Sequence, residues 1–407
     1  MKDLLRNRII EEVANQIDIP DTAYEKANAR YKDVGDWFDR PDAKSFPFKP
    51  HIYSQGSFRL GTVVRPVNSK GSYDLDLGCR LRSGITKLTH TQRQLKQLVG
   101  RDLEEYRIAR GIIEHKEEKH RCWRLNYSDS LNFHMDAVPS IPESSYKKQL
   151  IQEAMIKAGL SEQFVIDVTN RTGAITDNRL SNYDQISNDW KISNSEGYAR
   201  WFESRMRLAR LLLEKRAIEA KKAQIDELPS YQWRSPLQRC VQILKRHRDV
   251  MFADNSNVQP ISIIITTLAG LAYTGESEIV DALNRILTTM GNLVKSTSPR
   301  VANPVNPLED FADKWTDPQY SHLKLEYNFR RWLAKALSDF QNISDAKDIN
   351  LILEQAQKNF ALTFKSDELS ARLGLVATGS LLKQAATPSG LSFPPKPLTP
   401  KKPAGFA

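Results

Sequence analysis

YDLDLGCRL, residues 73–81, indicates the fold of this 407-residue chain more strongly than any other stretch. Its polar and apolar residues alternate, and successive side chains of a β-strand point to opposite faces of the sheet. The alternation predicts a strand with Asp74 and Asp76 on one face and the apolar residues on the other. Two carboxylates ~7 Å apart on one face repel each other unless a cation lies between them. Mg²⁺, which prefers oxygen ligands, is the natural cation, although an isolated pair of this kind also occurs by chance on exposed strands.

Upstream of this strand, QGSFRLGT (residues 55–62) follows the strand-like run HIYSQ and contains a Gly-Ser turn. A Gly-Ser turn that leads into a helix or a tight loop exposes backbone N–H groups and a hydroxyl, which suit a triphosphate. Gly56 and Ser57, with Gln55 beside them, are therefore candidates for nucleotide binding. Because a lone Gly-Ser pair is usually only a turn, this assignment depends on the neighbouring motifs.

Downstream, SLNFHMDAVPSIP (residues 130–142) alternates in the same way and leaves Asp136 charged in an otherwise apolar strand. A buried aspartate is costly unless it binds a cation or a hydrogen-bond donor, so Asp136 is the third candidate carboxylate. His134 lies on the same predicted face, and we expect it to be a hydrogen-bonded neighbour rather than a metal ligand.

The three motifs together suit one reaction. Two Mg²⁺ ions, or Mn²⁺ in their place, held by Asp74, Asp76 and Asp136 would activate an attacking hydroxyl and stabilise a leaving pyrophosphate. The Gly-Ser segment would hold a triphosphate in line for displacement. We therefore predict that these three carboxylates are both the metal ligands and the catalytic residues.

The rest of the chain predicts a mixed α/β half followed by a helical half. Two helices precede the first strand; strands are expected at residues 51–58, 73–81, 121–127 and 131–138, with a hairpin turn at 128–130 and a helix at 89–110. Helical periodicity dominates near residues 196–222, 235–252, 260–273, 277–294, 319–342 and 346–360. The last twenty residues contain six prolines, which exclude a regular helix or a central strand. The predicted domains are residues 1–195, residues 196–375 and a flexible tail, residues 376–407.

Composition excludes several classes of protein. A chain with 40% hydrophobic and 27% charged residues is typical of folded soluble domains. Its longest apolar run is too short to cross a bilayer and its N-terminus lacks the apolar region of a signal peptide, so we expect a cytoplasmic protein without a membrane partner. Three widely spaced cysteines argue against a disulfide framework or a cysteine-rich zinc site. The net charge of +10 suits a polyanionic partner, and it leaves open whether that partner is a nucleotide or a nucleic acid.

The order of the motifs resembles that of the DNA-polymerase-β-like nucleotidyltransferases, in which Gly-Ser precedes Asp-x-Asp and a lone Asp follows on a later strand. Within that superfamily, QGSFRLGTVVRP, YDLDLGCRL and FHMDAVPSIP look like the motifs of the bacterial cGAS/DncV-like nucleotidyltransferases, the CD-NTase or SMODS group. The resemblance covers roughly residues 1–360. It implies an α+β fold in which a nucleotidyltransferase core, a mixed sheet with helices, packs against a helical C-terminal domain that completes the nucleotide-binding cleft.

The resemblance also implies site residues in the helical half. LQRCVQILKRHRD is similar to the group's lysine-bearing helix, which gives Lys245 a role at the triphosphate, and Ser262 matches a phosphate-contacting serine. Each has a structural alternative, because Lys245 could lie on a solvated helix face and Ser262 could be an N-cap. GYARWFESRM resembles the helix that opens this half, and we expect its aromatic residues in the core. Residues 303–315 resemble the group's proline-rich loop.

The resemblance implies a Mg²⁺-dependent enzyme that joins ribonucleoside triphosphates into a cyclic di- or trinucleotide second messenger, releasing pyrophosphate. ATP is the expected first substrate, and the second base is left open. The group's role is antiphage (CBASS) signalling. Some members lie beside ubiquitin-like conjugation enzymes that attach the synthase's C-terminus to a target, so the end of the tail is a candidate for such a partner.

Two alternatives stay open. The same carboxylates would serve a nucleotidyltransferase that acts on RNA or on a small molecule, because the metals do not choose the acceptor. A catalytically silent nucleic-acid-binding scaffold would use the positive charge but has no evident need of the carboxylates. The zinc-binding insertion of the cytosolic DNA sensor synthase has no counterpart in this sequence, which argues against the same recognition of duplex DNA.

Overall fold

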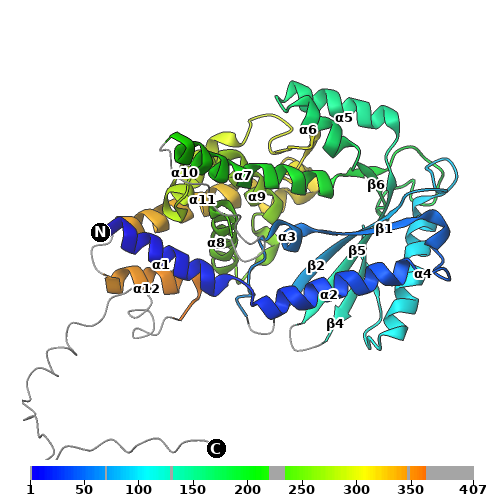
Figure 1. The fold of residues 1–407 in the computed structure, drawn as a ribbon, viewed down its shortest axis with the longest axis horizontal. Coiled ribbons are helices and arrows are strands. Elements are labelled where there is room, and N and C mark those ends of the chain that lie inside the picture. Colours follow the sequence, from blue (N-terminus) through cyan, green and yellow to red (C-terminus); the bar gives the residue numbers. More distant parts are fainter. Residues whose placement is uncertain (1, 69–70, 129–131, 220–233, 346–348, 364–407) are drawn as a thin grey trace, which may run out of the picture. The chain divides into compact units, whose positions relative to one another are not determined.

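The computed structural model describes residues 2–68, 71–128, 132–219, 234–345 and 349–363. Within these ranges, seven strands form one mixed sheet in the order β1-β2-β5-β4-β3, and β6 pairs with both β5 and β7 (Figure 1). The central pair, β2 and β5, is parallel, and its neighbours are antiparallel. The strands are Pro50–Gln55 (β1), Tyr73–Leu81 (β2), Glu117–Glu118 (β3), Trp123–Tyr127 (β4), Phe133–Pro142 (β5), Gly173–Ile175 (β6) and Lys191–Ser193 (β7).

Two helices, Asp21–Phe38 (α2) and Gln92–Ala109 (α4), pack on one face of this sheet. Their apolar residues join those of β2 and β5 in a single hydrophobic core, in which Leu75 and Met135 are fully buried. A capping box, formed by Thr91 and Gln94, starts α4. Because the apolar side chains of β2 and β5 face these helices, the polar side chains of both strands face the opposite side of the sheet.

The helical half surrounds one buried helix, α8. Ser235 and Gln238 form a capping box, and Pro236 occupies the first turn, where a proline needs no N–H partner. From Pro236 to Arg248 most of its residues are buried, including charged ones, and it contacts all the other helices of this half. The helices of this half, α8 included, are Lys2–Ile17 (α1), Ser195–Glu219 (α7), Pro236–Met251 (α8), Ser262–Ala272 (α9), Ile279–Met290 (α10), Leu325–Asp345 (α11) and Ile349–Phe360 (α12).

Shorter elements complete the two halves. They are the helices Gly56–Leu60 (α3), Ser145–Lys157 (α5) and Glu162–Thr169 (α6), the hairpin strands Ala302–Asn303 (β8) and Asn306–Asp310 (β9), and the 3₁₀ turns Phe46–Phe48, Ser256–Val258, Gly291–Leu293, Asp313–Trp315 and Pro318–Leu323. The hairpin β8–β9 forms a second, two-stranded sheet.

The structure confirms the predicted α+β fold class and corrects several elements. The strand expected at residues 51–58 ends at Gln55, because Gly56 adopts a left-handed conformation and begins α3. The loop expected at residues 303–315 contains the hairpin β8–β9. The aromatic residues Tyr198, Trp201 and Phe202 are buried, as expected.

The predicted domain division stays a proposal. Residue 195 is the first residue of α7, where the sheet-forming part of the chain ends, while Met1–Thr363 form one compact unit. The tail predicted at residues 376–407 and most of the turn at 128–130 lie outside the described residues.

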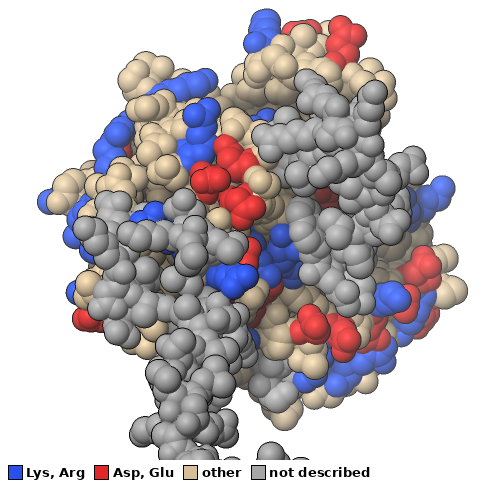
Figure 2. Space-filling model, turned by 60° about the vertical axis from the view of Figure 1, so that its left-hand side comes forward, with Lys and Arg blue, Asp and Glu red and all other residues tan. Residues whose placement is uncertain are grey.

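No helix in the described part of the chain is long and apolar enough to cross a membrane. On the face shown in Figure 2, acidic and basic side chains gather in neighbouring clusters. Neither sign of charge therefore covers the visible, described part of this face alone.

Candidate active site

Strand β2 places the two predicted carboxylates on the sheet face that points away from α2 and α4. Tyr73, Leu75 and Leu77 are at most 7% exposed on the core side. Asp74 and Asp76 alternate with them and lie on the other face. As the alternation predicted, Asp74 and Asp76 lie on the same face of the strand.

The parallel strand β5 brings the third carboxylate beside them. Asp76 pairs in register with Asp136, and Asp74 pairs with His134. Paired residues of neighbouring strands share a face, so Asp74, Asp76 and Asp136 gather on one patch of the sheet. His134 forms a hydrogen bond with Asn126 (Nδ1 to Oδ1, 2.7 Å), which agrees with its expected role as a neighbour.

The carboxylates perturb one another. Burial, followed by the negative charges of Asp74 and Asp136, raises the pKa of Asp76 to about 7. Burial is also the main cause of the raised pKa of Asp74, which the positive charge of Arg124 opposes. Such shifts are typical of functional sites, where charged groups are held together against their mutual repulsion.

Arg124 is a member of this cluster that the sequence did not reveal. It lies opposite Asp136 in the β4–β5 ladder, and its Nε and Nη2 atoms each lie 2.7 Å from an oxygen of Asp136. Its Nη2 is 3.8 Å from Oδ1 of Asp74. Among the described residues, no three carboxylate, imidazole or thiolate groups are arranged as a metal site. At the carboxylate patch, the guanidinium of Arg124 binds Asp136, one of the three candidate ligands.

The Gly-Ser segment lies directly beside Asp76. Gly56 has a φ of +64°, and a Cβ atom built on it would lie 1.9 Å from Oδ2 of Asp76. Only glycine meets both conditions, since other residues rarely adopt this conformation and would clash with the carboxylate. Ser57 follows in the first turn of α3, where backbone N–H groups have no partner within the helix.

The side chain of Gln55 has structural partners. Its Oε1 accepts a hydrogen bond from Ser195 Oγ at 2.7 Å, and its Nε2 donates to the carbonyl of Leu77 at 3.3 Å. Gln55 thus joins β1 to β2 and to the start of α7. A role for it in nucleotide binding therefore rests on its backbone.

Lys245 is buried on α8, so the alternative of a solvated helix face is wrong. Its Nζ donates to the carbonyl of Thr62 at 2.8 Å. Burial, then the charge of Arg248, lowers the pKa of Lys245 to about 8, while the carboxylates of Asp76 and Asp74 act in the opposite direction. The ammonium thus lies within electrostatic reach of the carboxylate patch.

Lys245 is one of four α8 side chains that donate to the last residue of α3 or to the segment after it. The others are Gln238 to the carbonyl of Leu60 (2.9 Å), Gln242 to that of Val63 (2.8 Å) and Arg246 to that of Arg65 (2.6 Å). We call residues 60–65 the clamped loop. Glutamines spaced one helical turn apart were visible in the sequence, but their partners, far away in the chain, were not.

Ser262 is the first residue of α9, one position after its N-cap, Ile261. Its hydroxyl accepts a hydrogen bond from Nη1 of Arg248 at 2.9 Å, and the same guanidinium nitrogen donates to the carbonyl of Pro260 at 3.0 Å. Arg248 thereby ties the start of α9 to α8, the helix that carries Lys245.

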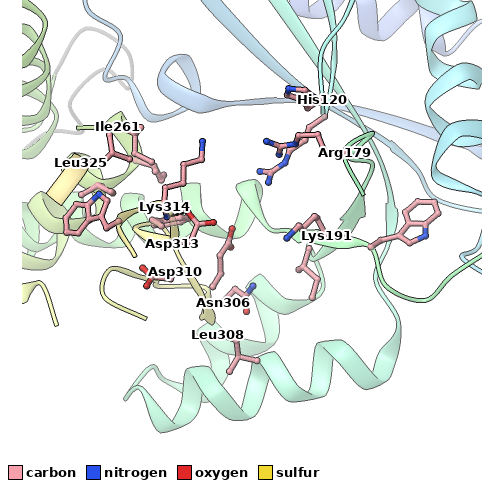
Figure 3. Close-up of a pocket in the computed structure, with 18 of the residues that line it drawn as sticks. His120, Arg179, Lys191, Ile261, Asn306, Leu308, Asp310, Asp313, Lys314 and Leu325 are labelled. Carbon is pink, nitrogen blue, oxygen red and sulfur yellow. Dashed lines mark hydrogen bonds between the residues drawn. The ribbon is translucent and has the colours of Figure 1, made fainter. Parts of the chain in front are cut away.

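A cleft of about 890 Å³ lies between the sheet half and the helical half (Figure 3). The wall from the sheet half is mainly cationic and includes Arg121, Arg179 and Lys191, whereas the opposite wall includes Glu309 and Asp313. Arg179 and Lys314 reach toward the cavity from opposite sides.

A smaller cavity of about 200 Å³ connects this cleft with the Gly-Ser segment. It is lined by Gly56 and shares Ile263, Glu309 and Phe311 with the larger cleft. Gly56 thus borders both this smaller cavity and the carboxylate of Asp76.

Comparisons with known proteins agree with this geometry. The family described as "Cyclic GMP-AMP synthase DncV-like, nucleotidyltransferase domain" matches residues 50–139, which contain all three carboxylates. A c-di-GMP synthase from Roseivirga ehrenbergii is 27% identical, with 93% of each chain covered. The cyclic dinucleotide synthase CdnG from Bradyrhizobium diazoefficiens is 22% identical over 76% of this chain and 70% of its own.

The solved structure of that Bradyrhizobium CD-NTase, in complex with GTP, shares the fold. It superposes with a TM-score of 0.61 at 19% identity and covers 91% of this chain and 98% of its own. Residues 50–139 therefore match the DncV-like nucleotidyltransferase domain, and over most of its length this chain is similar to bacterial cyclic dinucleotide synthases of the CD-NTase group.

Proposed function

We propose that this chain joins ribonucleoside triphosphates into a cyclic di- or trinucleotide and releases pyrophosphate at each step. The observation that carries the proposal is the in-register pair Asp76 and Asp136, with Asp74 on the same face of the sheet. Beside them lies Gly56, at a position where a side chain would clash with Asp76. The relatives that align over most of the chain are named as cyclic dinucleotide synthases, which supports the same reaction here.

The donor set suits Mg²⁺. Asp74, Asp76 and Asp136 offer hard oxygen ligands, and the raised pKa of Asp76 marks a carboxylate cluster that a cation would stabilise. When bound, the metal would lower the pKa of an attacking ribose hydroxyl and neutralise charge on the leaving pyrophosphate. Asp74 and Asp76 would hold both ions, and Asp136 would complete the site at the attacking hydroxyl after releasing Arg124.

The chain's own groups would position the donor triphosphate. Gly56 at the start of α3 lies next to Asp76, and Ser57 follows it in the first turn of that helix. The ammonium of Lys245 donates to the carbonyl of Thr62 in the clamped loop. Holding the reactants in line makes a large contribution to such a displacement. Ser262 would contribute if its hydroxyl, now bonded to Arg248, donates its proton to a phosphate oxygen.

Mass spectrometry tests this proposal. The purified protein is incubated with all four ribonucleoside triphosphates and Mg²⁺ or Mn²⁺, treated with phosphatase, and compared with the Asp74→Asn/Asp76→Asn double variant. We expect a phosphatase-resistant cyclic product from the unmutated protein alone. Linear or RNA-attached products would instead favour the acceptor-transferase alternative.

The biological setting is part of the same proposal. We propose ATP as a first substrate, a cytoplasmic location and a role in antiphage signalling through a separate effector. Conjugation through the C-terminus is also proposed from the resemblance alone, since residues 364–407 lie outside the described residues. Challenging cells that carry the intact gene or the Asp74→Asn/Asp76→Asn variant with phage tests the signalling role.

A further inference from the structure

The hairpin β8–β9 places three polar side chains at the cleft. Asn303 and Asn306 face each other across the two-residue turn, and Glu309 follows on β9. Asn303 Nδ2 donates to Oε2 of Glu309 at 2.8 Å, and its Oδ1 accepts from the N–H of Val305 at 3.0 Å. Asn303 is therefore committed to the hairpin, and it fixes the carboxylate of Glu309 in place.

Asn306 has an unused acceptor. Its side chain is 6% exposed and lines the cleft, and its Oδ1 is buried without a hydrogen-bond partner among the described residues. Its amide group hydrogen-bonds to Glu309 and so lowers the pKa of that carboxyl, against the larger raising effect of burial. A buried carbonyl oxygen without a partner is uncommon in native proteins and points to a missing donor.

Glu309 lines both the large cleft and the small cavity beside Gly56. It receives hydrogen bonds from amide donors on its hairpin side. Burial raises the pKa of Glu309, while these amide donors and the charge of Arg121 favour the ionised form, in which the carboxylate only accepts hydrogen bonds. Together with Asn306 Oδ1, it gives this part of the wall acceptor groups that need donors from a ligand.

Nucleobases differ in the donors that they can offer to such a wall. Guanine carries two neighbouring donors, N1–H and the N2 amino group. In adenine and in cytosine the amino donor lies next to an unprotonated ring nitrogen, and in uracil a single N–H lies between two carbonyls. A pair of acceptors therefore suits guanine and repels the ring nitrogen of adenine, and a site built on hydrogen bonds discriminates strongly against a ligand that lacks them.

We propose that Glu309 and Asn306 make this cleft selective for a guanine base. The inference rests on the proposed function, because it assigns the base of one nucleotide substrate. The opposite wall supports it: Arg121 and Arg179 are both held by buried Asp177, at 2.9 Å and 2.7 Å, and both line the cleft. Their fixed positive charges suit the phosphates of the same nucleotide.

Binding of non-hydrolysable α,β-methylene analogues of GTP and ATP to the full chain tests the selectivity. We expect the unmutated protein to prefer the guanine analogue by at least about tenfold. Glu309→Gln should reverse the preference, because its amide offers a donor to adenine N1 and an acceptor to adenine N6. Asn306→Ala, which keeps the carboxylate, should reduce the preference for guanine without reversing it.

Glu278→Gln, the same chemical change at an exposed residue before α10, is the matched control and should leave the ratio unchanged. Equal binding of both analogues by the unmutated protein, or equal weakening of both by Glu309→Gln, would overturn the selectivity. Because binding is measured separately from turnover, a guanine preference without any cyclic product would overturn the proposed function and leave this inference standing.

Discussion

Gly56 has a left-handed backbone conformation and also lies against the carboxylate of Asp76 in the candidate site. We predict that Gly56→Ala lowers stability by about 1–2 kcal/mol through its left-handed conformation and also displaces Asp76, with a loss of activity on the order of 100-fold. Gly111 is the matched control, since it has a φ of +63° and open space around its Cα. Gly111→Ala should lose comparable stability in chemical denaturation yet keep full nucleotide turnover. Equal activity of the two variants would contradict this account of Gly56.

The ionisation of Asp76 makes a second prediction at the residue scale. Its folded pKa, about 7, lies above the ordinary value for an aspartate, so the folded protein binds this proton more tightly than the unfolded chain. Stability is therefore lost as pH rises through the interval between the two values. Without divalent cations, Asp76→Asn should raise the melting temperature most above about pH 7, and the gain should shrink toward about pH 4.

Thermal melts in chelator across this pH range measure the effect. Asp281→Asn, which removes an exposed carboxylate from α10, should show no such pH-dependent gain. Added Mg²⁺ should stabilise the unmutated protein more than Asp76→Asn. A gain that is constant with pH would show that the charge of Asp76 is not its cause.

The sequence predicted the residues of the site better than their partners. The placement of Asp74 and Asp76 on one strand face could be predicted, as could the polar position of Asp136, because strand alternation is a local property. Arg124 could not, since its position opposite Asp136 depends on the register between β4 and β5, which the sequence does not state. The burial of Lys245 was left open for a similar reason, because KRHR also has the composition of an exposed helix face.

At the scale of elements, α8 determines how the clamped loop is held. Gln242 is fully buried and donates both to the carbonyl of Val63 and to Oδ1 of Asp18. We predict that Gln242→Ala costs roughly 1–3 kcal/mol, because it leaves buried acceptors unpaired, and that it raises the KM for nucleotide by shifting the loop. Urea denaturation and steady-state kinetics measure the two effects. Gln149→Ala, on the exposed surface of α5, should change neither.

Elements with one clear apolar face were predicted, and those without one were missed. The bounds of β2 match the prediction because its alternation runs through the whole strand. Helix α5 exposes Tyr146, Leu150 and Ile156, so its pattern lacks a single buried stripe. The hairpin β8–β9 is short and rich in proline, a composition typical of loops.

At the scale of the whole molecule, the described unit Met1–Thr363 contains every residue assigned to the site. We therefore predict that removing residues 376–407 leaves the melting temperature and the in vitro product unchanged. If the C-terminus is conjugated to a partner, the same deletion should abolish the conjugates in cells, which immunoblotting would detect. Unchanged conjugates after the deletion would exclude the C-terminus as the attachment site.

The clamped loop links the candidate site to helices on the far side of α8. Because α8 holds this loop through four side chains, a shift of the helix would strain or displace the loop. Helix α8 in turn packs against α11 and α12, and its His247 lies 3.0 Å from Asp339 of α11. A partner that displaces these outer helices would thus switch catalysis on or off from the back of the enzyme, without ever competing with the nucleotides.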